Sequence, residues 1–174
     1  MGEKENISMF ELVGNLVRVL EEQIKVYRHL LDIVRKEKDI LVSANLDELN
    51  ENNRSKEAML LKVRGLEAQR LKAAVELAQA LNMNGDQPRL LDMARSLPGE
   101  FGEKLRNIHS VLELLLRRVQ EYNKQNEALV QSALNNITGA MNAIKGTLQE
   151  KPTYQKKGEV EGHTAAGQLV RREA

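Results

Sequence analysis

Histidine, cysteine and paired carboxylates are the side chains that most often perform chemistry, and this 174-residue chain has few of them in a usable arrangement. It has no cysteine, and its three histidines are His29, His109 and His163. Metal sites in helical bundles use Glu-x-x-His, but Val26 and Arg106 stand where that motif needs glutamate. We therefore expect no metal site, and we expect His29 and His109 on helix flanks. Without cysteine there is also no thiol nucleophile or disulfide.

Motifs for phosphate binding and nucleophilic catalysis are also missing. The segment Lys145-Gly146-Thr147 lacks the earlier glycine and the preceding strand of a phosphate loop. No Gly-x-Ser-x-Gly sequence is present. The many carboxylates alternate with lysine and arginine, which is typical of solvated helix faces. We predict that the chain is not an enzyme and uses no cofactor.

Charge and hydropathy narrow the possible partners. Lysine and arginine number 26 against 25 acidic residues, and the two signs are interleaved along the chain. Nucleic-acid binders usually carry a basic excess, so this balance argues against DNA or RNA. No apolar run approaches the ~18 residues that a membrane span needs. The polar segment Met1–Asn6 lacks the apolar core of a signal peptide. We expect a cytoplasmic protein without membrane insertion.

Apolar residues at steps of three and four predict helices along most of the chain. Ser8 and Glu11 have the spacing of a capping box, and Asn45 is a suitable cap for a second helix. Gly85 is suited to the position after that helix, and Pro88 to the first turn of a third. The predicted helices run over about 8–42, 45–83, 86–97 and 99–149.

Two stretches interrupt this pattern. Residues 50–56 are polar all round, which predicts a weakly packed stretch or a kink. The periodicity ends near Pro152. The fold class that we predict is all-α, an elongated antiparallel bundle or coiled coil of three long helices and one short helix. Residues 1–149 would form the bundle domain, and residues 150–174 a flexible tail.

The last predicted helix is longer than the others. At 1.5 Å per residue it spans about 75 Å, against about 52 Å for the first, so it would overhang by about 20 Å from near Ile137. That part carries one apolar face, formed by Ile137, Met141, Ile144 and Leu148. An uncovered apolar face usually marks an interaction site. The alternative is that the helix breaks at Gly139 and the remainder folds back onto the core.

Tyr154 is the one aromatic residue in the predicted tail. A lone aromatic in a flexible segment can anchor a short linear motif, and the alternative is a residue without such a role. The other four aromatic residues lie on predicted helices, where core packing accounts for them.

Several segments resemble one known family. They are Tyr27-x-x-Leu30-Leu31, Leu46-Asp47-Glu48-Leu49, Asn123-x-x-Asn126-x-x-Leu129-Val130-x-x-Ala133-Leu134 and Tyr154-x-x-x-Gly158. Through them the chain resembles the FlgN-type flagellar export chaperones, although Val130 stands where leucine is common.

The resemblance implies a chaperone that binds terminal segments of flagellar hook-associated proteins and delivers them to the type III export gate. The cytoplasmic domain of the gate membrane protein and the export ATPase complex are the further implied partners. Carried over by position, the implied client-binding residues are Ala133, Ile137, Ala140, Met141, Ile144 and Leu148. The implied gate-docking residues are Tyr154 and Gly158. The alternative is a structural coiled-coil adaptor that self-associates through the same part of the last helix.

Overall fold

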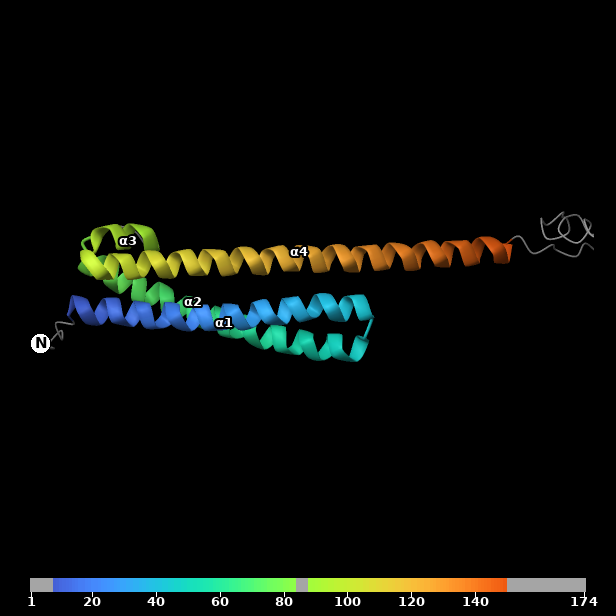
Figure 1. Cartoon of the computed structure of the whole chain (residues 1–174), viewed down its shortest axis with the longest axis horizontal. Coiled ribbons are helices and arrows are strands. Elements are labelled where there is room, and N and C mark those ends of the chain that lie inside the picture. Colours follow the sequence, from blue (N-terminus) through green and yellow to red (C-terminus); the bar gives the residue numbers. More distant parts are fainter. Residues whose placement is uncertain (1–7, 84–87, 150–174) are drawn as a thin grey trace, which may run out of the picture. The chain divides into compact units, whose positions relative to one another are not determined.

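The predicted all-α class is confirmed by the computed structural model, which describes residues 8–83 and 88–149. These residues contain four helices and no strand. In chain order the helices are α1 (Met9–Ser43), α2 (Leu46–Ala80), α3 (Leu90–Ser96) and α4 (Gly99–Gln149) (Figure 1). The chain divides into two compact units, Met1–Val130 and Gln131–Ala174.

Local capping starts α1 and α2 where the sequence predicts. The Ser8 backbone N–H donates to Glu11 Oε2 at 2.9 Å, and the Glu11 N–H donates to Ser8 Oγ at 3.3 Å, which completes the capping box. Asn45 Oδ1 accepts from the Glu48 N–H at 3.2 Å. Between these helices Ala44 adopts a left-handed conformation with φ of 54°. The chain therefore reverses within two residues.

The end of α2 and the start of α3 differ from the prediction. α2 ends at Ala80, before the predicted Met83, because Asn82 takes the left-handed conformation (φ 52°) that was expected of Gly85. The Met83 N–H then bonds to the Ala78 carbonyl at 2.9 Å, which is the bonding of a Schellman motif. Gly85 lies outside the described residues. α3 begins at Leu90 with Arg89 in the cap position, so Pro88 precedes the helix and the prediction that it lies in the first turn is wrong. Residues 86 and 87 lie outside the described residues.

The first unit packs as an up-down-up bundle. Gln23 contacts Glu67, and Glu37 contacts Lys56, so α2 runs antiparallel to α1. α4 runs parallel to α1 over residues 99–130, with Lys104 beside Glu21 near one end and Asn126 bonded to Val34 near the other. The main core cluster draws on all four helices, and its fully buried large side chains are Val13, Leu16, Leu20, Leu77, Met93 and Leu105.

A buried polar network joins α1, α2 and α4. The Glu37 carboxylate accepts from Lys56 Nζ at 2.8 Å and from Asn126 Nδ2 at 2.9 Å. Asn126 Nδ2 also donates to the Val34 carbonyl at 2.9 Å. The neighbouring Asn52 is buried and donates to the Ile33 carbonyl at 3.3 Å. The predicted weak packing over residues 50–56 holds for the five of them that are exposed, whereas Asn52 and Lys56 bond to α1, and α2 continues through this stretch as one helix.

The turn into α4 allows no side chain at Gly102. A Cβ atom there would lie 2.5 Å from the Ala94 carbonyl oxygen and 2.8 Å from the Leu97 carbonyl oxygen. Because both atoms belong to backbone, we expect Gly102→Ala to reduce the free energy of unfolding by about 1 to 2 kcal/mol. Gly14→Ala is the matched control, since a Cβ there meets nothing within 4 Å. It should stabilise α1 by about 0.5 to 1 kcal/mol. Equal urea midpoints for the two variants would contradict this packing.

Candidate binding surface

The second unit contains the last turns of α4. This helix continues without a break to Gln149, so the alternative of a break at Gly139 is wrong. Every side chain from residue 131 to residue 148 is exposed. Gly139 and Gly146 lie within the helix, and a Cβ at either would meet nothing within 4 Å. Each costs about 1 kcal/mol of helix propensity relative to alanine, which is too little to end the helix here.

The six predicted client-binding residues share one face of this helix. Each of them has another member three or four residues away, which places all six on one side of the helix. Their large members are Ile137, Met141, Ile144 and Leu148, with exposed fractions of 58, 53, 59 and 57%. Ala133 and Ala140 are exposed beside them. We call this set of six residues the apolar stripe, and its role in binding stays a prediction.

Two further apolar residues belong to the same face. Val130 and Leu134 are 43% and 53% exposed. Leu134 lies three residues before Ile137, and Val130 lies seven before it, so both continue the face toward the N-terminal end of α4. The prediction missed them, although the same three-and-four spacing in the sequence marks them.

The predicted gate-docking residues, Tyr154 and Gly158, lie outside the described residues. Their assignment stays a prediction, as does the boundary between bundle domain and tail at residues 149 and 150.

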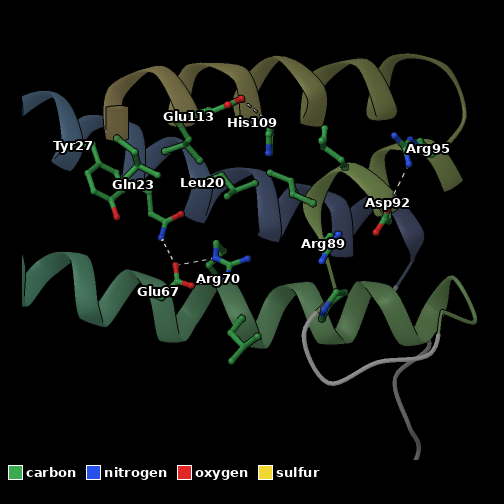
Figure 2. Close-up of a pocket in the computed structure, with 16 residues that line it drawn as sticks. Leu20, Gln23, Tyr27, Glu67, Arg70, Arg89, Asp92, Arg95, His109 and Glu113 are labelled. Carbon is green, nitrogen blue, oxygen red and sulfur yellow. Dashed lines mark hydrogen bonds and ion pairs between the residues drawn. The ribbon is translucent and has the colours of Figure 1, made fainter. Parts of the chain in front are cut away.

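A pocket of about 710 Å³ lies within the first unit and combines apolar and charged side chains. Figure 2 shows Gln23 and Arg70 both directed at the Glu67 carboxylate. Gln23 Nε2 donates to Glu67 Oε2 at 3.0 Å, and Arg70 Nε donates to the same oxygen at 2.9 Å. The hydrogen bonds from Arg70 lower the pKa of Glu67, and the same contact raises the pKa of Arg70. Burial raises the pKa of Tyr27 on the pocket wall.

Several charged side chains of this pocket are paired with one another. The hydrogen bonds from Arg70 favour the ionised form of Glu67, and Asp92 pairs with Arg95 at 3.3 Å. His109 lines the pocket 4.0 Å from Glu113, whereas His29 is exposed on α1. In the described part of the chain, no group of three or more His, Cys, Asp or Glu residues could hold a metal ion.

None of the helices α1 to α4 combines the length and the apolar character needed to cross a bilayer. The described residues are thus those of an all-α protein whose last helix carries exposed apolar side chains. The model of the family described as FlgN protein matches residues 9–162, and the chain belongs to this family. Membership gives it a chaperone role in flagellar export. Comparisons with curated proteins and with solved structures found no match.

Proposed function

We propose that this chain binds terminal helical segments of flagellar hook-associated proteins in the cytoplasm and keeps them from assembling before export. The apolar stripe is the client site, and an amphipathic client helix lays its own apolar face along it. The loaded chaperone then delivers the client to the export gate, through the cytoplasmic domain of the gate membrane protein and with the export ATPase complex as a further partner. No nucleotide chemistry by this chain is needed.

The observation that carries the proposal is an exposed run of large apolar side chains at heptad-like spacing. Ile137, Met141, Ile144 and Leu148 follow one another at steps of four, three and four, which is the spacing of a coiled-coil seam. All four are more than half exposed. Fully burying a side chain of this size contributes about 1.5 to 3 kcal/mol, and docking would bury the exposed half of each one, for about 0.8 to 1.5 kcal/mol per side chain. The stripe can thus supply most of the free energy of client binding.

The second candidate function is self-association as a coiled-coil adaptor through the same residues. The same exposed stripe favours it, because two copies of a heptad face can pair. Light scattering over a concentration series separates the two. A chaperone awaiting its client remains monomeric at micromolar concentration and forms a defined complex when the hook-associated protein is added. A stable homo-oligomer that protects residues 137–148 would favour the adaptor instead.

Tyr154 is expected to act in delivery and not in client binding. We predict that Tyr154→Ala leaves the Kd for the hook-associated protein within about twofold, because a residue outside the stripe contributes little to its burial energy. Binding of the loaded chaperone to the isolated cytoplasmic domain of the gate protein should fall at least about tenfold, as for loss of a central aromatic anchor. Tyr122→Ala is not a suitable control, since Tyr122 is partly buried and packs against a core cluster of the bundle. Gly158→Ala tests the second predicted docking residue in the same assay.

A further inference from the structure

Charge is distributed very unevenly along α4. Residues 99–130 carry ten charged side chains, five of each sign, whereas residues 131–149 carry one, Lys145. The chain as a whole is 29% charged. A helix face that only meets water normally carries charges. The low charge of residues 131–149 therefore fits a surface that becomes covered, and Lys145 is the exception on it.

Lys145 has no acidic neighbour on its own helix. Most ion pairs of the first unit join residues three or four apart, such as Lys25 with Glu22 and Arg117 with Glu113. The positions three and four residues from Lys145 hold Met141, Asn142, Leu148 and Gln149. The nearest acids in sequence are 18 residues before and five residues after it, and neither spacing brings side chains together on a helix.

The ammonium group lies beside the apolar stripe. Lys145 follows Met141 by four residues and precedes Leu148 by three, so on the helix surface it neighbours both. A client helix that covers Met141 and Leu148 would pass within reach of the lysine side chain. Long lysine stems pack along apolar surface while the charged end stays in water at the edge. This geometry suits an ion pair at the rim of an apolar interface.

We propose that Lys145 is the specificity-determining charge of this surface and pairs with one carboxylate at the edge of the client helix. This inference rests on the proposed function. The apolar contact supplies affinity but does not fix the register of the client helix. A client helix shifted by one heptad would present similar apolar side chains to the stripe. A single charge pair at a fixed position selects one register and one direction of the client helix.

Association kinetics with the purified hook-associated protein of the source bacterium test the pair. Lys145→Glu should slow association about fivefold at low salt and leave dissociation little changed, as charge changes at an interface rim do. Lys145→Gln should give an intermediate rate. Raising the ionic strength from about 50 mM to about 500 mM should slow the wild type and speed the Lys145→Glu variant, because salt screens both attraction and repulsion.

Two controls make the result specific. Lys124→Glu changes the net charge equally, but Lys124 lies about 31 Å away along α4, so its variant should associate like the wild type. Next, each acidic residue of the client terminal segment is changed to lysine in turn. One of these client variants should bind Lys145→Glu faster than it binds the wild type.

Three results would overturn the inference. Lys145→Glu could associate at the wild-type rate, Lys124→Glu could slow association equally, or no charge-reversed client variant could bind Lys145→Glu faster than it binds the wild type. These outcomes differ from failure of the proposed function. If the proposed function fails, client binding would be undiminished in the variant that combines Met141→Asp with Ile144→Asp.

Discussion

Replacing Met141 and Ile144 together with aspartate is expected to weaken client binding by more than about 100-fold, because each site loses about half of the ~1.5 to 3 kcal/mol of full burial and gains a charge that opposes docking. The new carboxylates would also have to leave water without a partner. Isothermal titration with the hook-associated protein measures the loss directly. Thermal unfolding should be nearly unchanged, since both side chains are more than half exposed and lie outside the first unit.

The matched control places the same charge on another side of the same helix. Asn135→Asp with Asn142→Asp adds two carboxylates at exposed, nearly isosteric positions off the apolar stripe. Asn142 lies three residues before Lys145 and Met141 lies four before it, so both variants place one acid near that lysine. The control should keep its Kd within about threefold of the wild type. Equal losses in both variants would show a general effect of charge and would remove the stripe as the client site.

Removing the Glu37 carboxylate is expected to lower the free energy of unfolding more than any other single substitution proposed for this chain. Glu37→Ala leaves the Lys56 ammonium without its 2.8 Å partner and takes one of two acceptors from Asn126. Breaking a fully buried pair costs about 3 to 5 kcal/mol. Because the Lys56 side chain is 23% exposed, water can partly solvate its unpaired ammonium group, which lowers this cost. We expect a loss of about 2 to 3 kcal/mol in the free energy of unfolding.

Asp39→Ala is the control for this experiment. It removes a carboxylate two residues further along α1 that is exposed, and it should change stability by less than about 0.5 kcal/mol. Urea denaturation followed by circular dichroism measures both variants. If Glu37→Ala unfolds at the same urea concentration as Asp39→Ala, the network does not hold α1, α2 and α4 together.

The helices and their caps could be predicted from local sequence because the interactions that fix them are local. The Ser8 capping box and the Asn45 cap bond to residues three positions away, so the pattern itself contains both partners. The apolar spacing likewise places Leu16 and Leu20 in the core, where both are fully buried.

The buried polar network could not be predicted in this way because its partners are far apart in the chain. Glu37 and Asn126 are 89 residues apart, and nothing in either local segment indicates that they meet. Residues 50–56 therefore looked unpacked in sequence, whereas Asn52 and Lys56 bond across to α1. The end of α2 was misplaced for a different reason. Glycine is the usual residue for a left-handed position, but Asn82 also tolerates it and comes first.

The apolar stripe could be predicted from periodicity, since the same spacing that builds a core also builds an exposed stripe. What periodicity does not reveal is whether such a face is covered within the chain. Among the residues that the structure describes, positions 131–148 are all exposed, which supports the proposal that the stripe is a docking surface.

Hydrogen exchange over residues 131–149, measured on the full chain alone and with the hook-associated protein bound, tests the proposed client site most directly. In the free chain these amides should exchange much faster than those of α4 residues 105–119, which pack in the core clusters. Client binding should slow exchange over residues 131–149 by at least about tenfold, as burial of the stripe stabilises the helix. Strong protection in the free monomer, or no change on binding, would contradict the proposed client site.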